Sequence, residues 1–172
     1  MKTTILLLFC ILILVLGIYG WKWVKVFTAS NYHQMLDALY SHSVPLISPD
    51  SIHNLEDYII LDARADNEYQ VSMLPNAQRI GYDNPNFDLV EQLPKDKAIL
   101  VYCSVGYRSE KIGEQLLEKG FTNVHNLYGG IFEWVNTKHD VVNSQQDTSH
   151  QVHGYSPSWG KWIKAKIDVV FD

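Results

Sequence analysis

The sequence predicts an α/β fold in which a five-stranded parallel sheet is flanked by helices on both faces. Short apolar runs, typical of strands buried on both faces, alternate with segments whose apolar residues have helical spacing. The length of 172 residues fits one such domain. Residues 3–21 carry no charge, which adds an N-terminal transmembrane helix to the predicted fold.

The N-terminal part of the chain, residues 1–28, is predicted to be a transmembrane anchor or signal segment. At a rise of about 1.5 Å per residue, the uncharged run 3–21 is just long enough to cross a bilayer. A cleaved signal peptide stays an alternative, although the small residues of a cleavage site do not follow the run. Lysines flank both ends of the uncharged run, so the side of the membrane on which the following domain lies stays open. The very short basic N-terminus favours an extracytoplasmic domain over a cytoplasmic one.

The next part, residues 29–43, is predicted to form a short connecting helix. Asn31 is a capping residue, and the apolar residues that follow it fall on one helical face. The α/β domain is expected over 44–138. Its predicted strands cover 44–47, 58–61, 78–80, 98–102 and 124–127, and its helices 66–71, 109–119 and 131–135, with helical spacing also at 87–93.

The last part, residues 139–172, begins as a polar loop. From His139 to about His153 the chain is poor in apolar residues, which is typical of an exposed loop. Aromatic residues return between Tyr155 and Phe171, so this end is expected to pack back on the rest of the chain.

Composition excludes several classes of function. The chain has 14 basic and 19 acidic residues, which give a net charge of −5. This composition offers no basic surface that would bind nucleic acid. The two cysteines, Cys10 and Cys103, are too few for a disulfide scaffold or a multi-cysteine metal site. His150 and His153 lie in a polar segment and form no cluster with other ligands. These residues therefore predict no metal site.

Cys103 is the candidate catalytic residue. It ends the most apolar predicted strand and is followed by Ser104, Val105, Gly106, Tyr107, Arg108 and Ser109, where a helix begins. Amides at a helix N-terminus and the charge of Arg108 both favour the thiolate form of a nearby cysteine. Gly106 permits a tight turn around the sulfur. The pattern predicts an anion cradle with a nucleophile at its base.

The motifs resemble those of the rhodanese family. The run from Cys103 to Arg108, followed by Ser109, is similar to that family's active-site loop, C-x-x-G-x-R followed by Ser or Thr. Leu61-Asp62-Ala63-Arg64 with Glu68-Tyr69 resembles its L-D-x-R…E-[FY] segment, and Leu127-Tyr128-Gly129-Gly130-Ile131…Trp134 its closing segment. One stretch departs from the pattern: residues 72–77 read S-M-L-P-N-A where the family has G-H-I-P-G-A.

The resemblance implies a rhodanese-like sheet and sulfur transfer from thiosulfate, or a persulfide donor, through a Cys103 persulfide. A thiol, cyanide or a protein thiol would accept the sulfur, and this chemistry needs no metal and no organic cofactor. Asp62, Arg64 and Glu68 are expected to support the structure. Two alternatives stay open: a non-catalytic binding or regulatory module, and a phosphatase or arsenate reductase, whose related loop is one residue longer.

Overall fold

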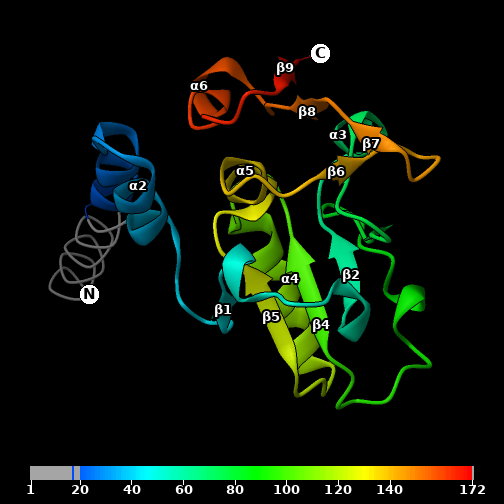
Figure 1. Ribbon diagram of the computed structural model, residues 1–172. Coiled ribbons are helices and arrows are strands. Elements are labelled where there is room, and N and C mark those ends of the chain that lie inside the picture. Colours follow the sequence, from blue (N-terminus) through cyan, green and yellow to red (C-terminus); the bar gives the residue numbers. More distant parts are fainter. Residues whose placement is uncertain (1–16, 18–19, 172) are drawn as a thin grey trace, which may run out of the picture. The chain divides into compact units, whose positions relative to one another are not determined.

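The computed structural model describes residue 17 and residues 20–171, and the chain divides into two units between Tyr40 and Ser41 (Figure 1). In the first unit, residues 20–28 are helical and α2 covers Tyr32–Leu39. The side chain of Asn31 accepts a hydrogen bond from the Gln34 amide at 2.9 Å, which confirms the predicted cap.

The predicted membrane anchor lies mostly outside the described residues. Within residue 17 and 20–171, no helix combines the length and apolar character that crossing a bilayer requires.

The second unit contains the predicted five-stranded parallel sheet, with strand order β1-β5-β4-β2-β3. The strands are β1 Leu46–Ile47, β2 Ile59–Asp62, β3 Gln78–Arg79, β4 Ile99–Tyr102 and β5 Val124–Leu127. The helices are α3 Asp66–Val71, α4 Tyr107–Glu118, α5 Gly130–Asn136 and α6 Pro157–Gly160, with 3-10 turns at Pro49–Ser51, Leu55–Asp57 and Phe87–Leu89. The stretch expected to be helical at 87–93 is thus one 3-10 turn, which stops before Pro94.

Burial explains why the central strands are so apolar. All four residues of β4 are buried, and α4 packs against β4 and β5. Leu61 and Val101 belong to a core cluster with Ile112 and Leu116 of α4. The alternate residues, which point to the other face of the sheet, are buried as well, among them Ile60 and Leu100. Both faces of the central strands are therefore covered.

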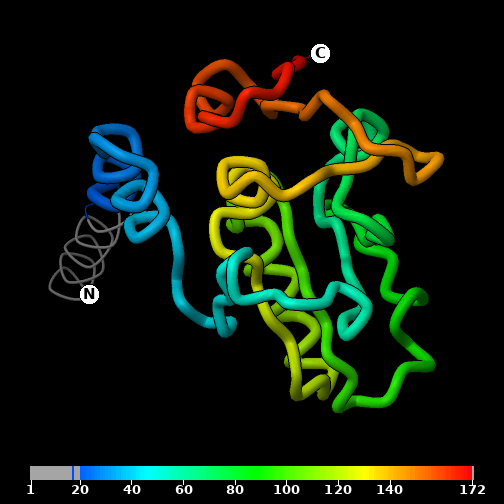
Figure 2. Tube along the Cα trace, in the orientation of Figure 1, coloured from blue at the N-terminus to red at the C-terminus, as the bar shows by residue number. Residues whose placement is uncertain are grey.

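Residues 139–172, here called the C-terminal segment, contain strands where the sequence predicts a polar loop. Strands β6 (Val141–Val142) and β7 (Thr148–Ser149) form an antiparallel pair, and β8 (Gln151–His153) pairs in parallel with β9 (Asp168–Val170). These strands are too short to show a periodic pattern. Figure 2 shows the segment passing over the end of the sheet where the strands finish, and β8 packs on α3.

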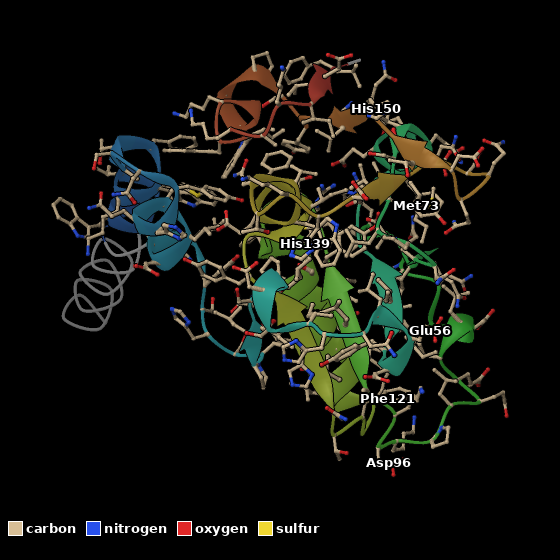
Figure 3. All side chains as sticks on the ribbon, viewed as in Figure 1. Glu56, Met73, Asp96, Phe121, His139 and His150 are labelled. Carbon is tan, nitrogen blue, oxygen red and sulfur yellow. The ribbon has the colours of Figure 1, made fainter. Side chains whose placement is uncertain are left out.

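The C-terminal segment docks on the stretch that departs from the family pattern. The backbone of Met73 exchanges two hydrogen bonds of 2.8 Å with that of Val142, and the Asn76 amide donates to the Gln146 side chain. In Figure 3, Met73 and His150 lie at the carboxyl end of the sheet, whereas Phe121 and Asp96 lie at the opposite end. Asn76 has φ +59, a left-handed conformation that asparagine tolerates in place of glycine.

Gly130 should be the least replaceable glycine next to the loop that follows β4. It has φ +58, and an added Cβ would lie 2.2 Å from the Cys103 carbonyl oxygen. Gly120 also has a positive φ, +87, but open space around it. We expect Gly120→Ala to cost about 1–2 kcal/mol for the left-handed conformation, and Gly130→Ala a further 1–3 kcal/mol or so for the overlap. Urea unfolding of both variants measures the difference, and equal losses would contradict it.

Candidate active site

Cys103 lies at the carboxyl end of β4, in the loop that leads into α4. Its side chain is buried, with 1% of its surface exposed. Gly106 caps α4 in a left-handed conformation with φ +94, which any other residue would adopt only with strain. In this conformation the Gly106 amide donates a hydrogen bond to Cys103 Sγ at 3.1 Å. The sequence-predicted turn around the sulfur is therefore present.

The backbone of this loop is held from α5. The Ile131 amide donates to the Cys103 carbonyl at 2.9 Å, and the Phe132 amide donates to the Ser104 carbonyl at 3.2 Å. These amides belong to the first turn of α5, where backbone donors have no partner inside the helix. The left-handed Gly129 and Gly130 bring that turn against the loop.

Asn126 of β5 also holds the backbone of this loop, although sequence reasoning did not select this residue. Its side-chain amide donates to the Gly106 carbonyl at 3.0 Å, and its oxygen accepts from the Ser109 hydroxyl at 2.7 Å. Both Asn126 and Ser109 are fully buried. The available signal was an asparagine near the end of a predicted strand, because a buried asparagine needs hydrogen-bond partners.

Glu68 and Arg108, 40 positions apart in the chain, form a bidentate ion pair. Arg108 Nη1 lies 2.7 Å from Glu68 Oε2, and Nη2 lies 2.8 Å from Oε1. The Ser104 hydroxyl donates to Glu68 Oε1 at 2.6 Å, and Arg108 Nη2 donates to Ser104 Oγ at 2.9 Å. The three side chains therefore form one closed network that ties α3 to the loop.

Electrostatics in this network favour both charges. Burial alone would raise the pKa of Glu68, but the hydrogen bonds and charge of Arg108 outweigh burial and lower that pKa to about 2. Burial alone would lower the pKa of Arg108, but its bonds to Glu68 and the nearby Cys103 raise it. The pair stays ionised at neutral pH.

Asp62 and Arg64 form a separate, fully buried ion pair with a shortest distance of 2.6 Å. Arg64 also donates to the Ser72 carbonyl at 2.6 Å. Burial opposes the charge of Arg64, but Asp62 raises its pKa overall. The pair links the end of β2 to the stretch 72–77.

A cleft of about 600 Å³ opens beside Arg108. Its lining includes Glu68, Arg79, Tyr82, Arg108, His153 and Tyr155. The last two belong to the C-terminal segment, and sequence reasoning did not place them at the site. Of the remaining predicted site residues, Val105 is buried and Tyr107 is partly buried as the first residue of α4.

The Glu68–Arg108 pair predicts a specific pH dependence of stability. Because the pKa of Glu68 falls from 4.5 to about 2 on folding, the pair stabilises the fold fully above about pH 5, and this contribution is lost as the pH falls towards 2. We expect Glu68→Gln to lower the unfolding free energy at pH 7 by about 3 kcal/mol. The deficit should shrink as the pH falls.

Urea unfolding at several pH values between 7 and 2.5 provides the measurement. Glu118→Gln, an exposed carboxylate at the end of α4, serves as the control and should change little at any pH. A Glu68→Gln deficit that stays constant down to pH 2.5 would mean that ionisation of Glu68 does not stabilise the fold.

Comparison with known proteins reveals several relatives. The chain is 37% identical over 84 residues to a tRNA uridine(34) hydroxylase of Cytophaga hutchinsonii, covering 46% of this chain and 27% of that protein. It is 33% identical over 92 residues to the adenylyltransferase and sulfurtransferase UBA4 of Meyerozyma guilliermondii, covering 49% of this chain and 22% of that protein. The chain thus spans about a quarter of the length of these relatives.

A solved structure has the same fold. The rhodanese-like domain of an Anabaena protein superposes with a TM-score of 0.53 at 21% identity, over 58% of this chain and 79% of that domain. A sequence model described as the rhodanese-like domain matches residues 50–137, which is just over half of the chain and includes the whole loop from Cys103 to Ser109. The chain belongs to the rhodanese-like domain family.

Proposed function

We propose that this protein is a sulfurtransferase that carries a sulfur atom on Cys103. The observation that carries the proposal is the loop itself. The Cys103 sulfur accepts the Gly106 amide, and α5 and Asn126 hold the backbone on both sides. An inert core cysteine needs none of these clamps. The word sulfurtransferase in the name of a relative, UBA4, supports the same chemistry.

The proposed reaction is a double displacement. The Cys103 thiolate attacks the outer sulfur of thiosulfate, a new S–S bond forms, and sulfite leaves with the electron pair of the broken S–S bond. The enzyme then carries a persulfide, whose terminal sulfur the loop amides stabilise. A thiol, cyanide or a protein thiol attacks that sulfur, takes it and releases the Cys103 thiolate. Another persulfide could replace thiosulfate as donor.

The loop favours sulfur over a tetrahedral oxyanion. Four residues separate Cys103 from Arg108, one fewer than in the related phosphatases and arsenate reductases. Moreover, both terminal nitrogens of Arg108 already bond to Glu68, and one also bonds to Ser104. The guanidinium therefore holds the loop in place instead of binding a phosphate through two parallel hydrogen bonds.

The persulfide can be observed directly. After incubation of the full chain with thiosulfate, we expect intact mass spectrometry to show a gain of one sulfur atom. Cys103→Ser should show no gain, because serine cannot form the S–S bond. Cys10→Ser is the matched control and should gain the sulfur like the wild type.

Two results would contradict this assignment. No adduct on wild type with either thiosulfate or an organic persulfide would favour a non-catalytic module. Hydrolysis of an aryl phosphate that exceeds sulfur transfer, and that requires Cys103, would favour the phosphatase alternative.

We also propose that residues 3–21 anchor the protein in a membrane, with the domain on the extracytoplasmic side. The uncharged run of bilayer length supports this. We expect the full chain to stay in the membrane pellet after alkaline carbonate extraction. Leu12→Arg, in the middle of the run, should weaken insertion by roughly 3 kcal/mol and release part of the protein. Release of the wild type, or a mature N-terminus beyond Ser30, would contradict an anchor.

A further inference from the structure

The C-terminal segment contributes to the cleft although it lies outside residues 50–137, which match the family. It docks through β6 on Met73 and through β8 on α3. The chain after β8 then brings Tyr155 over Arg108, with 5.1 Å between the guanidinium carbon and the ring centroid. One wall of the cleft is therefore built from residues outside the part of the chain that matches the family.

Tyr155 is held in a conformation that an aromatic residue rarely adopts. Its φ of +63 lies in the left-handed region, which costs free energy for a residue with a Cβ. Its amide donates to Nδ1 of the buried His153 at 3.0 Å, and the neighbouring Gly154 amide donates to the Val170 carbonyl. The backbone on this side of the cleft is therefore firmly placed.

Packing in a core does not account for this strained position, since 52% of the Tyr155 surface is exposed. Its contact with Arg108 instead places the ring at the rim of the cleft, directly over the side chain that holds the loop. The cleft has the volume of pockets that hold drug-sized molecules, far larger than an inorganic ion such as thiosulfate. The Tyr155 ring therefore takes up space that an entering molecule would otherwise fill.

The cleft is lined by Glu68 and Arg108 but not by Cys103 itself. We propose that it is the route to the buried Cys103, and that Tyr155 is a specificity-determining residue whose ring selects by size the compounds that pass. This role rests on the proposed function in one respect: if Cys103 transfers sulfur, the selected compounds are sulfur donors and acceptors. Arg108 keeps its bonds to Glu68 and Ser104 without the ring, so loss of the ring should change selectivity more than it changes the loop.

The test compares two alkylating reagents on the full chain. Iodoacetamide and a bulky N-aryl iodoacetamide carry the same reactive group, and peptide mass spectrometry separates labelling of Cys103 from labelling of Cys10. In the wild type we expect the bulky reagent to be the slower one at Cys103. In Tyr155→Ala its rate relative to iodoacetamide should rise roughly tenfold. Tyr155→Phe keeps the ring and should keep the wild-type ratio.

Two further variants separate size selection from a general loosening of the fold. Tyr155→Gly removes both the ring and the backbone strain, so it should lose selectivity without losing thermal stability. Tyr58→Ala removes a half-buried tyrosine just before β2, at the opposite end of the sheet, and should leave the ratio unchanged. An unchanged ratio in Tyr155→Ala, or equal acceleration of both reagents, would overturn the proposal.

Alkylation requires only the thiol, so this result is independent of sulfur transfer. If no persulfide forms but Tyr155→Ala changes the alkylation ratio, the proposed function fails and the role of Tyr155 stands. If the persulfide forms, the kcat/KM for a bulky aryl thiosulfonate relative to thiosulfate should rise in Tyr155→Ala and not in Tyr155→Phe. If Tyr155→Ala lowered kcat/KM for both donors in the same proportion, Tyr155 would have only a structural role.

Discussion

The site depends on one constraint, the fixed backbone path between Cys103 and Gly106. Gly106 must turn into the left-handed region for its amide to face the sulfur, and the carbonyl of Cys103 must receive the first turn of α5. Gly130 permits that approach because it has no Cβ. The path of the loop is thus fixed by contacts within the protein itself, and fixed dipoles of this kind are what the proposed reaction requires.

Buried charges hold this loop against the rest of the domain. Removing a carboxylate and a guanidinium from water is costly, and good geometry only offsets that cost. The bidentate Glu68–Arg108 pair with Ser104 has such geometry, and so does the pair Asp62–Arg64. Each pair joins the end of a strand or loop to a distant segment. Loss of one partner would leave the other charge buried and unpaired, so each pair favours the arrangement in which its two segments meet.

Much of this arrangement could be predicted from the sequence because it is local. Apolar runs mark β2 and β4, and the glycine and arginine after Cys103 mark the loop. The pairing of Glu68 with Arg108 could not be predicted, because it joins residues 40 positions apart. The role of Asn126 could not be predicted either, because its hydrogen-bond partners lie near it only when β5 lies beside α4. The strands of the C-terminal segment have two or three residues each, too few for a periodic signal.

The departure at residues 72–77 and the C-terminal segment are best understood as one feature. Met73 pairs with Val142, and Asn76, where the family pattern has glycine, adopts a left-handed conformation while its amide donates to Gln146. The stretch that differs from the family pattern is therefore the stretch on which the C-terminal segment docks. That segment in turn carries Tyr155 to Arg108. The Cys103 loop thus lies within the residues that match the family, whereas the side of the cleft that Tyr155 forms lies outside them.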